Sequence, residues 1–265
     1  MGNSRGNTWS LKHKTLNPSQ KAFWQFSFDE MGKYDIPAEL YFIMNKTGQK
    51  DVYYVGHSEG TTTGFIAFST YPELAKRIKM FGALSPVITG SYATSPLVKI
   101  ISVPEPLLRV LFGCKGALHQ IGFLKGPVTQ LCASLDKFCG HVLCYIAGGN
   151  IKNLNTSRID TYVGHSPAGT SVQDIIHCIH SGLLPFLQST PPAYKIEKIG
   201  TPIAVWSGGQ DKFADPKDMA ELLPRIPNLI YHEHFPAWGH LDFIWGLDAT
   251  EKMYRKIIEL MIKYF

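Results

Sequence analysis

A strand, a tight glycine-flanked turn and a helix follow one another directly in this 265-residue chain. The β-branched and aromatic run at residues 52–55 predicts a buried strand, and residues 62–68 predict a helix. Between them lies Gly56-His-Ser-Glu-Gly60, a Gly-x-Ser-x-Gly pattern. In this context the pattern is typical of a nucleophile elbow, in which the two glycines let strand and helix pass close together while the serine hydroxyl stays exposed. Ser58 is therefore the candidate nucleophile, and a plain glycine-rich turn is the alternative.

Strands that alternate with helices predict an α/β fold with a mostly parallel sheet. We expect further strands at residues 79–85, 202–207 and 229–235, and helical segments at residues 73–77 and 249–265. Asp35 precedes Ile36 and Pro37, which is typical of an N-cap followed by proline in the first turn. A helix is therefore expected to open at Asp35 and to run to about Asn45.

The alternation is lost between residues 88 and 200. Short apolar pieces at residues 97–101 and 107–112 are broken by proline and glycine, and an amphipathic helix is expected at residues 170–180. The stretch is too long for a loop, so we expect an inserted, mostly helical cap. The predicted organisation is a partial core at residues 1–87, a cap or lid at residues 88–200, and the rest of the core at residues 201–265.

Composition excludes several classes of function. The formal net charge is only +5 and the basic residues are scattered, which argues against nucleic-acid binding. No apolar run is long enough for a transmembrane segment, and the amino-terminal residues lack the apolar core of a signal peptide. None of the five cysteines forms a CxxC pair, and no His/Cys spacing matches a metal site. The sequence therefore predicts neither a metal nor another cofactor.

A serine nucleophile needs a base, and the base needs a third group that fixes its tautomer. Asp211 follows the strand expected at residues 202–207, and His240 follows the strand expected at residues 229–235. Both should therefore lie at the carboxyl edge of the sheet together with Ser58, in the order serine, acid, histidine. Ser58, Asp211 and His240 are the predicted catalytic set, with ordinary loop residues as the alternative.

Other residues compete for these roles. Asp242 is the nearest rival acid, but it lies after His240 and breaks the order, whereas Asp215 precedes a proline and is expected to be a helix N-cap. The histidines inside the strand at residues 229–235 would point sideways. Ser166 lies in a Gly-His-Ser-Pro-Ala-Gly sequence that has no preceding strand and has proline after the serine. His57 flanks Ser58, and a packing role is expected for it.

Several longer motifs resemble those of the acid lipase family, which includes the gastric and lysosomal acid lipases. The matching stretches are Gly2-Asn-Ser-Arg-Gly-Asn-Thr-Trp-Ser, Phe26-Ser-Phe-Asp-Glu-Met, Gly56-His-Ser, Ile66-Ala-Phe-Ser-Thr, His165-Ser-Pro-Ala-Gly-Thr-Ser, Ala204-Val-Trp-Ser-Gly-Gly and His240-Leu-Asp-Phe-Ile-Trp-Gly. The resemblance covers essentially the whole chain. It implies an α/β-hydrolase that cleaves triacylglycerols or cholesteryl esters at a lipid–water interface, beneath a helical cap, in a secreted or lysosomal protein. Ser58, Asp211 and His240 occupy the family's catalytic positions.

The resemblance also implies further site residues. Glu59, where the family usually has glutamine, supplies a backbone N–H to the oxyanion hole, and its carboxylate is tolerable there if it is protonated or turned to solvent. Asn45 and Asn155 match glycosylated positions of the family. Cys132 and Cys139 are the candidates for its cap disulfide, although Cys132 is offset by a couple of positions, so loss of the bridge is the alternative.

One departure concerns the sheet. The elbow serine follows the fifth strand in this fold, yet 57 residues precede Ser58 and they contain no clear strand before residues 52–55. The family's second oxyanion donor lies in a His-Gly motif, and this sequence contains no His-Gly. We therefore expect an α/β-hydrolase-type sheet that is incomplete at its amino-terminal side, with residues 52–55 as an exposed apolar edge. A catalytically weak or inactive truncated lipase-like protein is the alternative to an active lipase.

Overall fold

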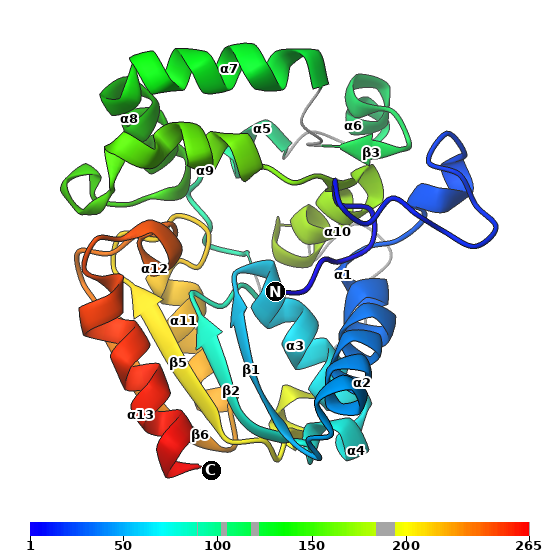
Figure 1. Ribbon diagram of the computed structural model, residues 1–265, viewed down its shortest axis with the longest axis vertical. Helices are drawn as coiled ribbons and strands as arrows, with labels where there is room; N and C mark the ends of the chain where they lie inside the picture. The colour runs from blue at the N-terminus through cyan, green and yellow to red at the C-terminus, as the bar shows by residue number, and fades with distance from the viewer. Residues whose placement is uncertain (89, 102–104, 118–121, 184–193, 265) are drawn as a thin grey trace.

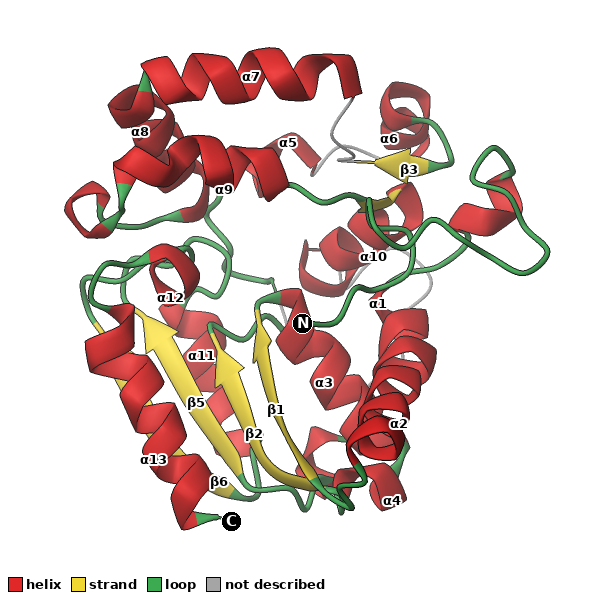
Figure 2. Cartoon of the chain, viewed as in Figure 1, coloured by secondary structure: helices red, strands yellow, loops and turns green. Residues whose placement is uncertain are grey.

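A parallel sheet lies between two layers of helices, and further helices lie above the carboxyl ends of its strands (Figures 1 and 2). The computed structural model describes residues 1–88, 90–101, 105–117, 122–183 and 194–264. The main sheet has the order β1-β2-β5-β6, and all its neighbours are parallel. Its strands are β1 (Val52–His57), β2 (Ile78–Leu84), β5 (Ile203–Gly208) and β6 (Leu229–Phe235). The predicted α/β fold and its mostly parallel sheet are confirmed.

Side chains of β2 alternate between two hydrophobic layers, as a strand with both faces covered requires. Phe81 and Ala83 point into the layer covered by α2, α3, α4 and α11, whereas Met80 and Leu84 point into the layer covered by α12 and α13. These helices are α2 (Ile36–Thr47), α3 (Glu59–Thr70), α4 (Pro72–Ala75), α11 (Pro216–Leu222), α12 (Asp242–Trp245) and α13 (Arg255–Lys263), the last preceded by the π-turn η7 (Thr250–Tyr254). Two packed layers therefore fix the strands whose ends carry the candidate site.

The helix expected to open at Asp35 begins earlier, and the Asp35 prediction was wrong. It starts with α1 (Phe28–Glu30), passes through the π-turn η2 (Met31–Asp35) and continues as α2. Ser27 is the N-cap, in a capping box in which its N–H donates to Glu30 Oε2 at 2.7 Å. Asp35 has helical dihedral angles and instead binds the Arg5 guanidinium, with Nη2 2.7 Å from Oδ1. The wider turn η2 ends at Asp35, two residues before Pro37, which has no backbone N–H to donate within the helix.

β1 is one of the two edge strands of the main sheet. Among the described residues no strand pairs with its free side, and Val55 is 42% exposed, whereas residues 52–54 are partly buried. The expected unpaired edge is therefore confirmed, but of residues 52–55 only Val55 is exposed. Edge strands present unpaired backbone groups to solvent, which makes them sites of association.

The cap lies between β2 and β5 in the sequence. It contains α5 (Pro96–Ile101), α6 (Glu105–Phe112), α7 (Gly122–Ser134), α8 (Asp136–Ala147), α9 (Ile159–His165), α10 (Val172–Leu183), the 3-10 turns η3 (Ile151–Asn153) and η4 (Thr156–Arg158), and the antiparallel pair β3 (Gly116–Ala117) and β4 (Thr170–Ser171). The amphipathic helix begins at Val172 rather than at residue 170 because Thr170 and Ser171 pair with β3. Three further 3-10 turns are η1 (Lys21–Trp24), η5 (Ile196–Lys198) and η6 (Leu223–Arg225).

Two features stabilise the cap. Cys132 of α7 and Cys139 of α8 form a disulfide whose Cα atoms lie 5.6 Å apart. The amino-terminal segment reaches the cap as well, because the Thr8 N–H donates to the Ala168 carbonyl at 2.9 Å and the Ser171 hydroxyl donates to the Phe26 carbonyl at 2.5 Å. Residues far apart in the sequence thus hold the cap over the sheet. In the part of the chain that the structure describes, no helix is long and apolar enough to cross a bilayer.

Candidate active site

Ser58 lies on a strained turn between β1 and α3. Its φ of 55° and ψ of −121° lie in a region that residues other than glycine rarely adopt. The Ser58 N–H donates to the Leu84 carbonyl at 3.1 Å, and the Thr61 hydroxyl donates to the Ser58 carbonyl at 2.6 Å. The first contact holds the turn against the end of β2 and the second holds it against the first turn of α3.

Only one of the two flanking glycines is required by packing. A Cβ at Gly56 would lie 2.5 Å from the Gly60 carbonyl oxygen, closer than atoms can approach. A Cβ at Gly60 would meet nothing within 4 Å. The prediction that a glycine is needed for the close approach of strand and helix is therefore correct for Gly56. It is wrong for Gly60, where a Cβ atom would have room.

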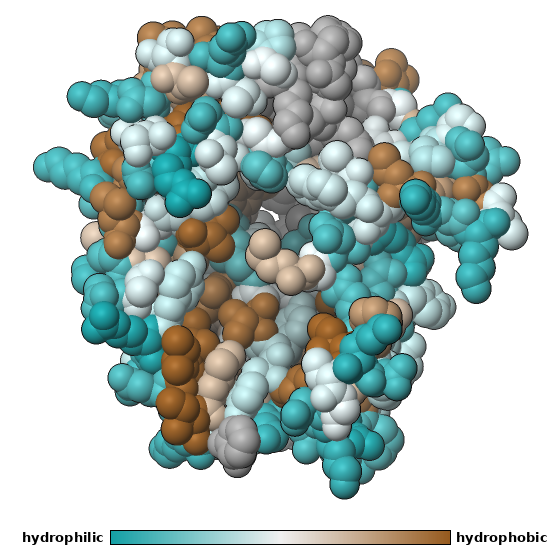
Figure 3. Space-filling view, in the orientation of Figure 1, coloured by the Kyte–Doolittle hydropathy of each residue, from teal (hydrophilic) through white to brown (hydrophobic). Residues whose placement is uncertain are grey.

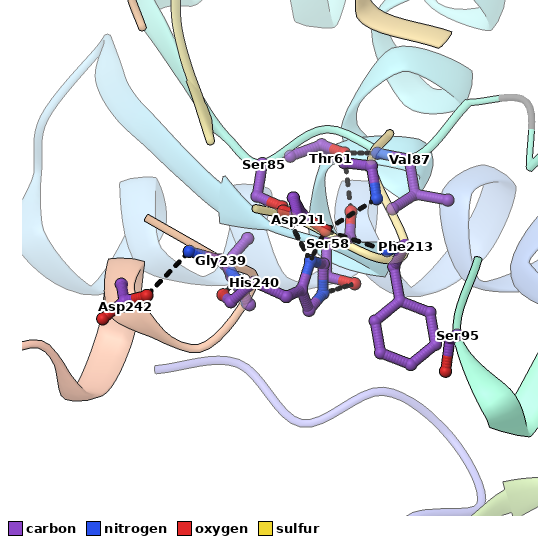
Figure 4. A network of polar contacts seen from close by, with 12 residues as sticks. Ser58, Thr61, Ser85, Val87, Ser95, Asp211, Phe213, Gly239, His240 and Asp242 are labelled. Atoms are coloured by element: carbon purple, nitrogen blue, oxygen red, sulfur yellow. Dashed lines mark hydrogen bonds and ion pairs between the residues drawn. The ribbon is translucent and has the colours of Figure 1, made fainter. Parts of the chain in front are cut away.

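The structure brings the three predicted catalytic residues into one hydrogen-bonded chain (Figure 4). Ser58 Oγ lies 2.8 Å from His240 Nε2, and His240 Nδ1 lies 3.0 Å from Asp211 Oδ2. Ser58 follows β1, Asp211 follows β5 and His240 follows β6, so all three lie at the carboxyl ends of parallel strands. When the Ser58 hydroxyl donates to Nε2, the neutral imidazole carries its proton on Nδ1, facing the carboxylate.

Asp211 is held as an ionised acceptor. It is 3% exposed, and its Oδ1 accepts the N–H groups of Phe213 and Ala214, each at 2.9 Å. Burial alone would raise the pKa of this carboxyl. The charge of His240 and the hydrogen bonds from His240, Ser85 and Phe213 oppose burial and bring the pKa below its usual value. The carboxylate is therefore charged where it faces the imidazole.

Ser85 is a fourth polar residue at the site, and the sequence reading did not single it out. It directly follows β2, and its φ of 48° ends that strand at Leu84, one residue before the expected end. Its buried hydroxyl donates to Asp211 Oδ2 and lies 2.7 Å from His240 Nδ1 (Figure 4). In the sequence its one signal was its place at the end of the strand expected at residues 79–85; the contact with Asp211 depends on the order of the strands in the sheet.

His57 contacts His240 through both its ring and a hydrogen bond. Its Nε2 lies 2.9 Å from the His240 carbonyl oxygen, and the ring centroids lie 4.7 Å apart. Burial, together with the charge of His240, lowers the pKa of His57 to about 3, so the ring is neutral near pH 7 and donates from Nε2. The expected packing role is present, and a positioning hydrogen bond accompanies it.

The rival residues have other partners. Asp242 accepts the Gly239 N–H at 2.7 Å and the Asn153 amide at 2.8 Å, so it braces the loop that carries His240. Asp215 is the N-cap of α11, as expected, and accepts the Lys217 N–H at 2.9 Å. The histidines of β6 contact Ser207. Ser166 follows α9 in the cap and is joined to the next residue by a cis peptide bond.

Glu59 pairs with a carboxyl group of the cap. It is the first residue of α3, in the first turn, where helical N–H groups lack an intrahelical acceptor. Although Glu59 is an exposed residue, desolvation of its carboxyl raises the pKa well above the usual value. The charge of Asp174 and the hydrogen bond to Asp174 raise it further. These effects favour the protonated form of the Glu59 carboxyl, which can then donate a hydrogen bond to Asp174.

Asp174 belongs to α10 and is almost completely buried. Its Oδ1 accepts the Phe28 N–H at 2.7 Å and its Oδ2 accepts the Thr170 hydroxyl at 2.8 Å. Burial raises the pKa of this carboxyl as well, whereas the hydrogen bonds from Thr170, Glu59 and Phe28 act in the opposite direction. The pair therefore links the start of the elbow helix to the cap.

The other predicted positions lie away from this centre. Asn45 is exposed near the end of α2, and Asn155 is partly buried and accepts the Ser157 hydroxyl at 2.7 Å. Among the described residues no group of three or more His, Cys, Asp or Glu side chains could hold a metal ion.

Known proteins share this fold and sequence. A family profile described as alpha/beta hydrolase fold matches residues 1–101. The lysosomal acid lipase/cholesteryl ester hydrolase of Homo sapiens is 52% identical over 282 aligned positions, which cover 100% of this chain and 71% of the relative. The gastric triacylglycerol lipase of Rattus norvegicus is 48% identical, over 98% of this chain and 71% of the relative.

Solved structures show the same fold at low sequence identity. A putative aryl esterase from Burkholderia cenocepacia superposes with a TM-score of 0.55 at 15% identity, over 99% of this chain and 78% of that one. An alpha/beta hydrolase fold protein from Nakamurella multipartita gives a TM-score of 0.53 at 15% identity, over 88% and 75%. With relatives at about half identity over its full length, the chain belongs to the acid lipase family of α/β-hydrolases.

Proposed function

We infer that this chain is a serine ester hydrolase that cleaves lipid esters through an acyl-enzyme on Ser58. The observation that carries the proposal is the continuous contact from Ser58 Oγ through His240 to Asp211, with distances of 2.8 and 3.0 Å. These residue types supply a nucleophile, a base and the acid that orients the base. Their place at the carboxyl ends of three parallel strands, beneath the cap, is where ligands bind in this class of sheet.

In the first half of the reaction Ser58 Oγ attacks the ester carbonyl carbon, and His240 Nε2 takes the hydroxyl proton. The imidazolium keeps its second proton on Nδ1, where the Asp211 carboxylate stabilises the positive charge. As the tetrahedral intermediate collapses, the bond to the alcohol oxygen breaks and His240 returns the proton to that oxygen. The alcohol leaves, and the acyl group remains on Ser58.

In the second half a water molecule attacks the acyl carbon, and His240 Nε2 takes its proton. Collapse of this intermediate breaks the bond to Ser58 Oγ and returns the proton to the serine. The fatty acid leaves. In both halves the oxyanion accepts the Glu59 backbone N–H at the start of α3.

Protonation of Glu59 removes the negative charge that a glutamate would otherwise place beside the oxyanion, at a position where the family usually has glutamine. An ionised carboxylate beside a developing oxyanion would repel it, whereas a neutral carboxyl bonded to Asp174 does not. An acidic compartment would keep the proton in place. Relatives whose name includes "lysosomal" support the predicted lysosomal or secreted location.

The substrate class follows from the relatives and from the cap. The relatives' names specify a triacylglycerol lipase and a cholesteryl ester hydrolase, so lipid esters are the proposed substrates. Large exposed apolar side chains lie on α7, at the turn after it and on α8, namely Val128, Leu131, Leu135, Phe138, Val142 and Tyr145. Exposed apolar side chains gathered in this way suit contact with a lipid–water interface. Figure 3 shows apolar residues on the cap and a hollow between the cap and the sheet.

A second candidate is a weakly active or inactive lipase-like chain. It is favoured by the sequence, which contains no His-Gly motif for a second oxyanion donor. Loss of one such donor reduces kcat by about 10²–10³-fold. The acyl-enzyme proposal and the weakly active or inactive alternative therefore differ in the rate they predict, not in the residues they use.

Turnover of a short-chain p-nitrophenyl ester by the purified chain tests the proposal. We expect Ser58→Ala to abolish turnover and Ser166→Ala to leave it unchanged, because Ser166 lies in a similar sequence but outside the hydrogen-bonded chain. Equal turnover in wild type and Ser58→Ala would overturn the acyl-enzyme proposal. Turnover at the uncatalysed rate in all three proteins would favour the inactive chain.

A further inference from the structure

Ser85 is a buried serine whose hydroxyl has both of its polar contacts in the candidate acid–base pair. The residue is 0% exposed, and its Oγ donates to Asp211 Oδ2 and lies 2.7 Å from His240 Nδ1. A buried hydroxyl lowers stability unless it is hydrogen-bonded, and the contacts with Asp211 and His240 satisfy this requirement. The Ser85 N–H donates to the Trp206 carbonyl at 2.8 Å, which fixes the backbone between β2 and β5.

The direction of each hydrogen bond follows from the protons available. Asp211 is ionised and can only accept, so the Ser85 hydroxyl proton points to its Oδ2. The Oγ lone pairs then face His240 Nδ1, which carries the imidazole proton when Ser58 donates to Nε2. Nδ1 lies nearer to Ser85 Oγ, at 2.7 Å, than to either Asp211 oxygen, at 3.0 and 3.1 Å.

We propose that Ser85 is a positioning residue that bridges His240 and Asp211, so that the site works as a chain of four residues rather than three. This inference rests on the proposed function of Ser58, His240 and Asp211. Ser85 keeps the Nδ1–H tautomer of His240 and orients the Asp211 carboxylate, and it touches no substrate atom. Its backbone conformation serves the same end, because the positive φ of 48° turns the side chain from the end of β2 toward the acid.

The alternative is that Ser85 only shapes the turn before Pro86. Two variants separate these roles. Ser85→Ala removes the hydroxyl and keeps the backbone preference, whereas Ser85→Gly also removes the hydroxyl but favours a positive φ. A turn-forming role predicts that glycine retains wild-type kcat. A positioning role predicts that both variants lose kcat by about 10–100-fold with little change in KM, as for a lost hydrogen bond to a charged group.

A double-mutant cycle gives a second readout. On an Asp211→Asn background, Ser85→Ala should add less than about threefold to the loss, since residues that act as a unit are not additive. Fully additive losses would contradict the bridge. Ser207→Ala is the control, because Ser207 is likewise a buried serine whose hydroxyl contacts histidine side chains, in its case those of β6.

Proton NMR tests the bridge without any turnover. The Nδ1–H of His240 should give a downfield resonance that disappears in His240→Gln, shifts in Ser85→Ala and Ser85→Gly, and stays in place in Ser207→Ala. An unchanged resonance in both Ser85 variants would overturn the proposal. If wild type shows this pattern but hydrolyses no ester, the proposed function fails while the role of Ser85 stands.

Discussion

His57 and His240 are joined by a hydrogen bond of 2.9 Å between the His57 ring nitrogen Nε2 and the His240 backbone carbonyl. The residue before the candidate nucleophile therefore braces the residue that carries the candidate base. Replacement of His57 by phenylalanine keeps a ring against His240 but removes the donor. We expect His57→Phe to lower kcat by about tenfold, the usual effect of one lost hydrogen bond, with KM unchanged. Steady-state kinetics on a p-nitrophenyl ester check this, and an unchanged kcat would contradict the bracing role.

The lowered pKa of His57 also predicts a change in acid sensitivity. In the folded state its pKa is about 3, against about 6.5 for an ordinary histidine, so the unfolded chain binds more protons between these values. The contribution of His57 to the free energy of unfolding is therefore at its maximum above pH 6.5 and falls as the pH drops toward 3. Thermal denaturation at pH 7 and pH 4.5 should show a smaller loss of Tm for His57→Phe than for wild type. A loss as large as that of wild type would contradict the burial of a neutral ring.

The Glu59–Asp174 pair predicts the opposite pH dependence. Because the folded-state pKa of Glu59 is raised, the folded chain holds a proton that the unfolded chain releases above about pH 4.5. The pair makes its full contribution to the free energy of unfolding below that pH. This contribution is lost as the pH rises toward and through the folded-state pKa. In Glu59→Gln the proton-dependent part is absent, so its Tm relative to wild type should increase from pH 4.5 to pH 7. Glu73→Gln is the control, since Glu73 is exposed beside Lys76, and its Tm difference should stay constant.

Asp211 and Asp242 should respond differently to the same change. Asp211→Asn should reduce kcat by about 10⁴-fold, because the asparagine favours the wrong imidazole tautomer. Asp242 binds Gly239 and Asn153 rather than the His240 ring, so Asp242→Asn should lower Tm but reduce kcat by less than about tenfold. Equal losses of kcat in the two variants would show that the acid has been assigned to the wrong residue.

Packing at the turn predicts an asymmetry between its two glycines. A Cβ at Gly56 would overlap the Gly60 carbonyl, and overpacking of this kind lowers stability by about 1–3 kcal/mol. Gly60→Ala meets no neighbour and replaces glycine in the first turn of α3, so it should be neutral or stabilising by up to about 1 kcal/mol. Urea denaturation of both variants measures the difference, and equal destabilisation would contradict it.

Local patterns predicted the main sheet and the three residues that meet at its edge. The run before Ser58 and the strands before Asp211 and His240 have strong β signals, and parallel strands place their carboxyl ends together. The first long helix starts earlier than predicted, because the capping box at Ser27 begins it and Asp35, before the proline, makes no cap hydrogen bond.

Ser85 and the Glu59–Asp174 pair were missed for a different reason. Both depend on contacts between residues more than a hundred positions apart, which no local pattern records. Ser85 meets Asp211 only because β2 and β5 are neighbours in the sheet. Glu59 meets Asp174 only because the cap folds back over α3. Such contacts need the tertiary arrangement.

Covalent labelling by a fluorophosphonate tests the central claim most directly. The probe reacts with a serine only when a base activates the hydroxyl, and mass spectrometry then identifies the modified peptide. We predict one label per chain, on the peptide that contains Ser58, with none in Ser58→Ala or His240→Gln and full labelling in Ser166→Ala. Labelling that persists in Ser58→Ala, or that is absent from the folded wild-type chain, would contradict the account.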